Sequence, residues 1–331
     1  MNLSVSVIIT CFNLERYIGA AIRSALAQQL DRPFEVIVVD DHSTDRSRDI
    51  IRSFDGVRCV QAPRNSGVLL AMLEGIRAAQ GELLFFLDGD DLWEEGKLSA
   101  CVKAFEADPA CVLVTHDLCF IDEHDQLLDR TSRPREALDS LPAGRRGPAV
   151  LDAILHHRDF VWLGSAFGVR RSLGQIDQFD AWARALPDPA NTYQDWPLAF
   201  WAAALPDVTV TYVPHKLFRY RLHRANHSGD ASSAGRAARN FLRARNTLEA
   251  MYDLAKARNL PASILRTLRS RGRAYDYLAS LYLGQRVSAL KGFPGAAPDF
   301  FRRGELAKEL ARLLGVLLIG PQRFAQAAAG R

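Results

Sequence analysis

The chain has 331 residues, of which 48% are hydrophobic and 24% are charged, an ordinary balance for a globular protein with a large core. Its five cysteines are odd in number and include no C-x-x-C pair, which argues against a disulfide framework or a zinc site. The net charge of +4 hides an asymmetry: residues 1–235 carry 24 Lys and Arg against 32 Asp and Glu, whereas residues 236–331 carry 18 against 6. No basic and apolar leader precedes the first apolar run, so we expect a cytoplasmic protein.

Apolar runs and segments with helical spacing alternate along the first 107 residues. Consecutive Val, Ile and Leu residues are typical of strands that are buried on both faces of a sheet. Strands that alternate with helices form βαβ units, so we expect an α/β fold with a mainly parallel, Rossmann-like central sheet flanked by helices. The expected strands are Val5–Thr10, Phe34–Val39, Val57–Val60 and Leu83–Leu87, and later Val112–Thr115, Trp162–Val169 and Val208–Val213.

Acidic residues directly follow two of the expected strands. Asp40 and Asp41 come after the second strand, and Asp88, Asp90 and Asp91 follow the fourth. Ligands in open α/β sheets bind beyond the carboxyl ends of the strands, and crowded carboxylates suit Mg²⁺ or Mn²⁺. The chain has no glycine-rich dinucleotide or P-loop motif, so a metal would have to hold any bound phosphate. The alternative is a solvated turn.

Four segments carry a family resemblance. Val5–Asn13, Glu35–Asp45, Asn65–Gly67 and Gly81–Trp93 occur in this order and spacing within the first 93 residues. Together they resemble glycosyltransferase family 2, whose members have the GT-A fold. The resemblance implies a nucleotide-sugar donor, a divalent cation (Mn²⁺ or Mg²⁺) at the D-x-D motif, and inversion at the anomeric carbon.

The resemblance also assigns nucleotide-binding residues. Thr10 and Phe12 would lie against the base, and the flat ring of Phe12 suits stacking, although a core position is the alternative. Asn13 and Asn65 would join the nucleotide-sugar site. Asp41 would accept hydrogen bonds from the base, while the neighbouring Asp40 would orient the loop.

A second group of residues is expected around the metal and the diphosphate. Asp88 would hold the ribose or the metal, and Asp90 would ligate the metal directly. Asp91 would either join them or cap the segment Leu92–Lys97. In the family's Y-R-x-H-x-x-N-x-S pattern, which begins here at Tyr220, Arg221 would meet the leaving phosphate and His223 would lie near the metal. The alternative is a cationic surface loop.

The catalytic base is expected at Asp195. The sequence Gln194-Asp195-Trp196 resembles the family segment whose Asp is the general base, with Gln194 in place of the usual first acid. An acceptor hydroxyl is a poor nucleophile until a base takes its proton, so a carboxylate is required. The alternative role for Asp195 is capping the helix that contains Leu198–Leu205, and the two roles are compatible.

The C-terminal region differs in character from the rest. We expect a GT-A catalytic domain over residues 1–235, with a nucleotide-sugar half (1–115) and an acceptor half (116–235), followed by a basic helical appendage over 236–331. Helical spacing covers Arg236–Arg258, Pro261–Tyr282 and Gly304–Ile319. A basic, Leu-rich end suits peripheral contact with the inner face of a membrane; a cap on the catalytic domain or a homo-oligomer contact fits equally well. No nucleic-acid motif accompanies the arginines.

The sequence therefore predicts a metal-dependent inverting glycosyltransferase. It would move a sugar from a nucleotide-diphosphate sugar to a saccharide or lipid-linked saccharide acceptor, in cell-surface polysaccharide or glycolipid synthesis. One alternative is a sugar-phosphate nucleotidyltransferase, which would be expected to carry a glycine-rich basic loop after its first strand. Another is a non-catalytic scaffold that binds nucleotide or membrane.

Overall fold

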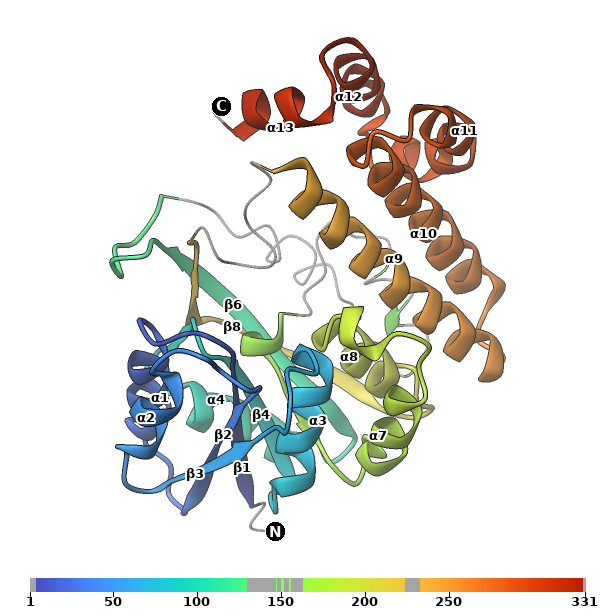
Figure 1. Cartoon of the computed structure of the whole chain (residues 1–331). Helices are drawn as coiled ribbons and strands as arrows, with labels where there is room; N and C mark the ends of the chain where they lie inside the picture. The colour runs from blue at the N-terminus through green and yellow to red at the C-terminus, as the bar shows by residue number, and fades with distance from the viewer. Residues whose placement is uncertain are drawn as a thin grey trace. The chain divides into compact units, whose positions relative to one another are not determined.

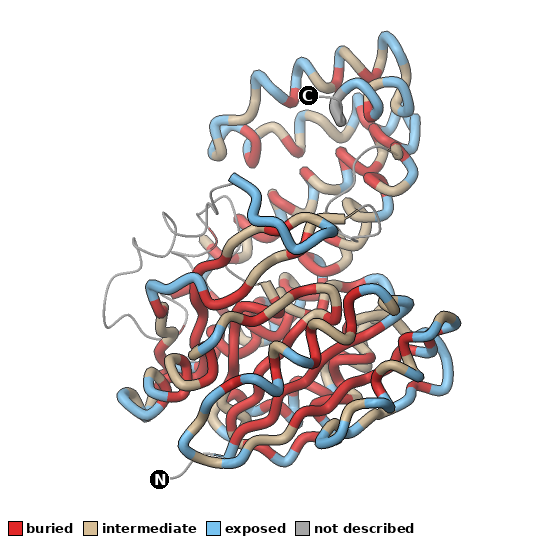
Figure 2. Tube along the Cα trace, turned by 90° about the vertical axis from the view of Figure 1, so that its left-hand side faces the viewer, coloured by how far each residue is buried: buried red, intermediate tan, exposed pale blue. Residues whose placement is uncertain are grey.

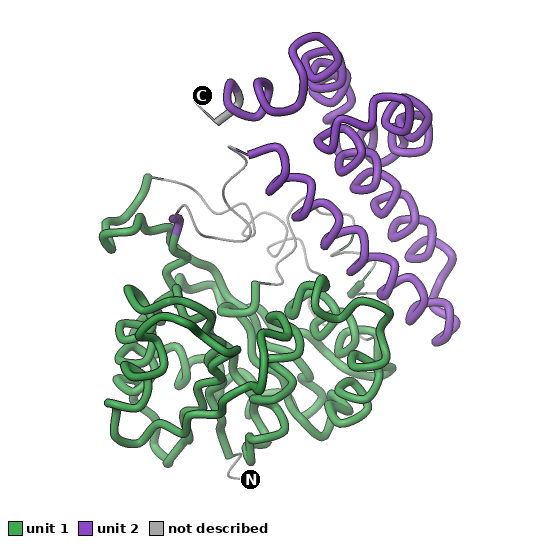
Figure 3. The backbone as a smooth tube through the Cα atoms, in the orientation of Figure 1, with its two compact units in different colours: residues 1–221 green, residues 222–331 purple. Residues whose placement is uncertain are grey.

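The structure is a computed structural model of the chain, and it describes residues 4–129, 147, 150, 151, 155, 163–223 and 233–329. The chain divides into two compact units, Met1–Arg221 and Leu222–Arg331 (Figure 3). The sequence suggested a boundary at residue 235, and the first helix of unit 2 begins at Ala234.

Unit 1 is built around a mixed eight-stranded sheet with the order β3-β2-β1-β4-β7-β6-β8-β5. Strands β1 to β4 run parallel to one another, which confirms the parallel arrangement expected for the first half of the chain. All seven residues of β1 are buried, and the buried residues of unit 1 are concentrated in its interior (Figure 2). These strands are β1 (Val5–Cys11), β2 (Phe34–Asp40), β3 (Val57–Gln61) and β4 (Leu83–Asp88).

The other half of the sheet is mixed. Strand β7 pairs antiparallel with both β4 and β6, β6 and β8 are parallel, and β5 pairs antiparallel with β8. The expected strand Trp162–Val169 is wrong over most of its described part, because Gly164–Ala166 forms a 3₁₀ turn, η1; Trp162 lies outside the described residues. The remaining strands are β5 (Leu92–Trp93), β6 (Cys111–Ile121), β7 (Gly168–Arg170) and β8 (Thr209–Arg221).

Helices lie on both faces of the sheet (Figure 1). Helices α1, α2 and α4 are on one face, and α3, α7 and α8 are on the other. Their bounds are α1 (Ile18–Leu26), α2 (Ser47–Arg52), α3 (Val68–Ala78), α4 (Lys97–Ala107), α7 (Ile176–Arg184) and α8 (Asp195–Ala203), with a second 3₁₀ turn, η2, at Pro189–Asn191.

Unit 2 is helical in its described part. Helix α10 packs against α9 and α11, and Tyr277 and Phe300 lie in their shared core. Helix α11 was not anticipated, because Pro294 and Pro298 usually interrupt helices; both lie within α11 and are exposed. The helices are α9 (Ala234–Ala257), α10 (Ala262–Tyr282), α11 (Arg286–Arg302), α12 (Leu306–Ile319) and α13 (Pro321–Ala329). In the described ranges, every helix is too short or too polar to cross a bilayer.

Candidate active site

The carboxyl ends of β1, β2 and β4 bring the predicted residues to one edge of the sheet. The strand register places Thr10 opposite Asp88 and Cys11 opposite Asp40. The Thr10 hydroxyl donates a hydrogen bond to Asp88 Oδ1 (3.3 Å). Because adjacent strands pair in parallel, Asp40 and Asp88, which are 48 residues apart in the sequence, lie at the same edge of the sheet.

The loop after β3 is organised by Asp41. This buried carboxylate accepts hydrogen bonds from the Ser66 amide (2.9 Å) and hydroxyl (3.1 Å) through Oδ1, and from the Gly67 amide (2.9 Å) through Oδ2. Gly67 has φ 90°, and a Cβ there would lie 2.6 Å from the carbonyl oxygen of Ala190 in η2. Only glycine therefore fits at the point where this loop meets the segment before Asp195. Asn65 is exposed, and its Oδ1 accepts from the Gly67 amide (3.2 Å).

The loop after β1 is fixed by polar contacts around Asn13. Asn13 has φ 54°; its side-chain oxygen accepts from the Thr44 amide (2.8 Å), and its own amide donates to Ser43 Oγ (3.0 Å). Asp40 accepts from the Ser43 amide (3.0 Å) and Arg48 Nε (3.0 Å), which is the loop-orienting role expected of it. The Phe12 side chain is 38% exposed, so part of its ring is accessible.

The acids after β4 are crowded. Burial, reinforced by the charge of Asp90, raises the pKa of Asp88 to about 6. Burial and the charges of Asp90 and Asp88 raise the pKa of Asp91 well above its ordinary value. Gln194 Nε2 donates to Asp88 Oδ1 (2.5 Å), on the same oxygen that accepts from Thr10. Carboxylates that repel one another in a partly buried position favour a bound cation.

Asp91 has a structural role that differs from the expected helix cap. Leu92–Trp93 is strand β5, and α4 begins at Lys97 with Gly96 as its N-cap. Asp91 instead accepts from the Ser165 hydroxyl (2.6 Å) and from the Arg221 amide (2.9 Å). Because Ser165 Oγ also accepts from the Asp88 amide (3.0 Å), one hydroxyl in η1 links both ends of the acidic segment.

Lys97 was not anticipated from the sequence. Its side chain is fully buried, its Nζ donates to the carbonyl oxygen of Ser165, and it lies 4.1 Å from the centre of the Trp93 ring. Trp93 Nε1 donates to the same carbonyl (3.2 Å). Burial lowers the pKa of Lys97 to about 7, against the opposing effects of Cys101 and Asp91. The only sequence signal for this part of the site was the run of small residues at 164–166.

Arg221 is buried at the end of β8. Its Nε donates to the Asp90 carbonyl (2.6 Å), its Nη1 donates to the Asp122 carbonyl (3.2 Å) and pairs with the Asp125 carboxylate, and its guanidinium lies 4.8 Å from the Tyr17 ring centre. These contacts position the backbone of the acidic segment. Contact with a phosphate stays a prediction, as does the role of His223, the second residue of unit 2.

Asp195 lies at the same site as Asp88. A Cβ on Gly164 would lie 3.2 Å from Gln194 Nε2, 3.8 Å from Asp195 Cβ and 3.9 Å from Asp88 Oδ2, so these side chains surround the Gly164 backbone. Burial, and then the charge of Asp88, raise the pKa of Asp195 to about 7. Asp195 Oδ1 accepts from the adjacent Trp196 amide (2.9 Å), and Asp195 is the first residue of α8 rather than its N-cap.

Asp88 and Asp90 are the described residues that we expect to hold a metal ion. Across the described ranges, no three His, Cys, Asp or Glu side chains converge into a metal-binding group. Asp88 and Asp90 nevertheless fit a hard cation, since they supply oxygen ligands and mutual repulsion that a cation relieves. Mg²⁺ and similar ions commonly combine one or two carboxylates with substrate phosphates and water.

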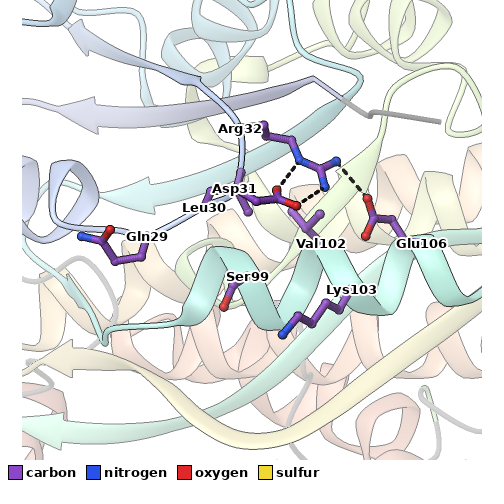
Figure 4. Close-up of a pocket in the computed structure, with 8 residues that line it drawn as sticks. All are labelled: Gln29, Leu30, Asp31, Arg32, Ser99, Val102, Lys103 and Glu106. Atoms are coloured by element: carbon purple, nitrogen blue, oxygen red, sulfur yellow. Dashed lines mark hydrogen bonds and ion pairs between the residues drawn. The ribbon is translucent and has the colours of Figure 1, made fainter.

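A separate pocket of about 360 Å³ lies between α4 and the loop before β2 (Figure 4). Its Arg32 is paired with Asp31 (2.7 Å) and Glu106 (2.9 Å). The loop precedes β2, whereas Asp40 is the last residue of that strand. The pocket therefore lies at the opposite end of β2 from the candidate site.

Comparison with known proteins shows which family the first half of the chain is similar to. Residues 6–161 match the model described as Glycosyl transferase family 2. This segment of the chain is similar to glycosyl transferase family 2. Among curated family relatives, an uncharacterized glycosyltransferase from Nostoc sp. is 39% identical over 138 residues, which are 39% of this chain and 41% of the relative.

Two further relatives carry more specific names. The Bacillus subtilis putative teichuronic acid biosynthesis glycosyltransferase TuaG is 38% identical over 98 residues (28% of this chain, 38% of the relative). Escherichia coli WfaP, named as a UDP-Glc:alpha-D-GlcNAc-diphosphoundecaprenol beta-1,3-glucosyltransferase, is 34% identical over 106 residues (31% and 42%). The matched segments span less than half the length of these relatives.

Two solved structures of similar fold align with most of the chain. S. aureus TarS 1-349 in complex with UDP-GlcNAc aligns with TM-score 0.57 at 15% identity, covering 91% of this chain and 92% of TarS. The mannosyltransferase PcManGT from Pyrobaculum calidifontis, in complex with GDP-Man and Mn²⁺, aligns with TM-score 0.53 at 20% identity, covering 100% and 85%. This likeness confirms the GT-A fold expected from the sequence.

Proposed function

We propose that the protein is a metal-dependent, inverting glycosyltransferase that transfers a sugar from a nucleotide-diphosphate sugar to an acceptor hydroxyl. One observation carries the proposal: Asp195, with its pKa raised to about 7, lies beside Asp88 and Gln194 around the Gly164 backbone. A general base works best when its pKa is near the working pH. An acid of this kind next to a cation-favouring pair is the arrangement that sugar transfer needs.

The chemistry proposed for Asp195 is proton abstraction. Its carboxylate accepts the proton of the acceptor hydroxyl while the hydroxyl oxygen forms a bond to the anomeric carbon. The bond from the anomeric carbon to the β-phosphate oxygen breaks, and its electron pair leaves with the nucleoside diphosphate. Attack from the face opposite the leaving group inverts the anomeric configuration. A positioned base contributes roughly 10²-fold to 10⁴-fold to such a reaction.

The donor is proposed to lie at the carboxyl ends of β1, β2 and β4. The partly exposed Phe12 ring stacks on the base, and Asp41 keeps the loop at Ser66 and Gly67 in place beside it. Thr10, Asn13 and Asn65 complete the nucleotide site.

The diphosphate is proposed to lie over the acidic segment that follows β4. Mn²⁺ or Mg²⁺ held by Asp90 and Asp88 would supply positive charge for the leaving diphosphate. The neighbours' titles record UDP-GlcNAc for TarS, and GDP-Man with Mn²⁺ for PcManGT.

The acceptor is proposed to be a saccharide or a lipid-linked saccharide in the synthesis of a cell-surface polysaccharide or glycolipid. TuaG is named for teichuronic acid biosynthesis, and WfaP for a sugar on a diphosphoundecaprenol carrier. We place the protein in the cytoplasm at the inner face of the membrane, where such a carrier presents its sugar.

The test begins with binding. Thermal shifts with UDP, GDP and dTDP, each with and without Mn²⁺, should show one nucleotide that stabilises only with the metal. Its sugar nucleotides are then screened for release of nucleoside diphosphate with a lipid-linked saccharide. The product's anomeric configuration, read by NMR, should be opposite to that of the donor. Release of pyrophosphate from a sugar phosphate and a nucleoside triphosphate would instead identify a nucleotidyltransferase, and retention would remove the role of Asp195.

A further inference from the structure

The exposed large apolar side chains are concentrated in one part of unit 2. Of the twelve in the described part of the chain, eight lie between residues 283 and 319; Leu283 directly follows α10, and the other seven lie on α11 and α12. The other four are dispersed over unit 1. A concentration of exposed apolar side chains marks an interaction site more often than a free surface.

Helix α11 presents one apolar face to solvent. Val287 (65% exposed), Leu290 and Phe301 (73% exposed) are joined on this face by Pro294 and Pro298, which are also exposed. The spacings of three, four and seven residues put these positions on one side of a helix. The opposite side carries the buried Ala289, Ala296 and Phe300, which pack into the core of unit 2.

Helix α12, which packs against α11, repeats this pattern. Leu310, Leu314 and Leu318 follow one another at intervals of four residues, and Leu318 is 82% exposed. The buried side of the helix holds Leu313 and Val316. We refer to Val287, Leu290, Phe301, Leu310, Leu314 and Leu318 together as the α11–α12 surface.

The charges around this surface have one sign. Exposed cations lie on all three C-terminal helices: Arg286 and Lys291 on α11, Lys308 on α12 and Arg323 on α13. Between residues 283 and 329 the acids are Asp299, Glu305 and Glu309.

These acids are paired within unit 2. Arg303 lies 3.0 Å from the Asp299 carboxylate and 3.1 Å from that of Glu305, and Arg312 lies 3.1 Å from that of Glu309. Asp299 and Glu309 are also buried. No acid in the described range 283–329 is classed as exposed, so the outward charge beside the α11–α12 surface is positive.

We propose that the α11–α12 surface docks on an anionic phospholipid membrane. The leucines and Phe301 would enter the boundary between headgroups and acyl chains, and Lys291, Lys308 and their neighbours would contact the lipid phosphates. A second copy of the chain fits less well, because joining two such surfaces face to face would bring cations against cations.

The proposed surface is more specific than the membrane contact expected from the sequence. The reason for docking rests on the proposed function, in which the acceptor is lipid-linked. The sequence pointed to the basic, Leu-rich end of the chain, whereas the structure shows that the exposed apolar side chains include those of both α11 and α12. Docking by this surface would hold the enzyme at the membrane where a lipid-linked acceptor presents its hydroxyl.

The test measures co-sedimentation of the full chain, without nucleotide, with sucrose-loaded vesicles. Vesicles of phosphatidylcholine with about 30% phosphatidylglycerol should bind at least about tenfold more protein than phosphatidylcholine alone, and added salt should weaken binding by screening. Leu314→Glu/Leu318→Glu should abolish binding, and Lys291→Glu/Lys308→Glu should reduce it. The matched control is Leu127→Glu, a 66% exposed leucine of unit 1, which should bind as the wild type does.

Three outcomes would overturn the proposal. The first is equal binding to neutral and anionic vesicles, and the second is full binding by the Leu314→Glu/Leu318→Glu variant. The third is a wild-type protein that does not bind vesicles and is a dimer, together with a Leu314→Glu/Leu318→Glu variant that is a monomer. Light scattering after size exclusion reports the last of these, and circular dichroism checks that each variant is folded. Because binding is measured without nucleotide, and also on Asp195→Asn, failure of catalysis and failure of docking are distinguished.

Discussion

Replacing Asp195 by Asn should make the protein less active and more stable at the same time. The amide has nearly the shape of the carboxyl group and can still accept the hydrogen bond from the Trp196 amide (2.9 Å), so the fold should be kept. The amide cannot take a proton from an acceptor hydroxyl at neutral pH. We expect kcat to fall by roughly 10²-fold to 10⁴-fold, the usual contribution of a general base, with nucleotide binding retained.

The stability change follows from the pKa of Asp195. Burial and Asp88 raise it from 3.8 to about 7, so the folded state binds a proton that the unfolded state has released between these two pH values. Stability is therefore lost as the pH rises from about 4 through 7. The full effect would be about 4 kcal/mol, at roughly 1.4 kcal/mol per pH unit. Because Asp195 is only partly buried and water screens its interaction with Asp88, we expect about 1–2 kcal/mol.

The assay is urea unfolding of the metal-free wild type and of Asp195→Asn at pH 4.5 and pH 8. From pH 4.5 to pH 8, the free energy of unfolding of the variant should increase by about 1–2 kcal/mol relative to that of the wild type. The kcat/KM of the wild type should rise with pH through a pKa near 7, and the variant should lack this rise. Asp55→Asn, a change at an exposed acid, serves as the control and should alter neither. Unchanged sugar transfer by Asp195→Asn, or a stability difference independent of pH, would refute the reasoning.

Three other predictions concern groups that hold the site together. Asp41→Asn keeps one acceptor oxygen but loses the carboxylate that binds the Ser66 and Gly67 amides. Nucleotide affinity, measured by calorimetry, should fall by about tenfold, which is the cost of a charge-assisted hydrogen bond. An unchanged Kd would contradict the role of this loop. Lys97→Met should destabilise the protein by about 1 kcal/mol in urea unfolding, because the Ser165 carbonyl loses one of its two side-chain donors. Unchanged stability would contradict this role of the Lys97 ammonium. Phe12→Ala should raise the donor KM by roughly 10-fold, as expected for a lost stacking platform, with kcat little changed, and an equal fall in kcat would point to a structural role.

The sequence was sufficient for the parts of the site that depend on local pattern. The apolar runs located β1, β2 and β4, and the acids that follow them are at one edge because consecutive parallel strands pair with their ends in register. Asp195 was expected from the resemblance of Gln194-Asp195-Trp196 to the family segment, and its nearness to Asp88 is seen only in the fold.

The contacts of Ser165 and Lys97 could not have been found in this way. Ser165 bonds to Asp88 and Asp91, more than 70 residues earlier, and no periodic pattern reports such a pairing. A lysine at the start of a helix is expected to be solvated, whereas Lys97 is buried against the Ser165 carbonyl. The strand expected across residues 162–169 is wrong at residues 164–166 for a related reason. These residues form the 3₁₀ turn η1, from which Ser165 contacts Asp88 and Asp91.

The position of β7 has a consequence for how the gene should be divided. Strand β7 sits between β4 and β6, so the sheet is continuous only when residues 168–170 are present. The segment that matches the family model ends at residue 161, before this strand and before α8. A fragment that ends there would leave the edge of β4 unpaired, and an unpaired strand edge promotes aggregation. In a nascent chain, β4 can pair with β1 at once, but it can pair with β7 only after residue 170 has been synthesised.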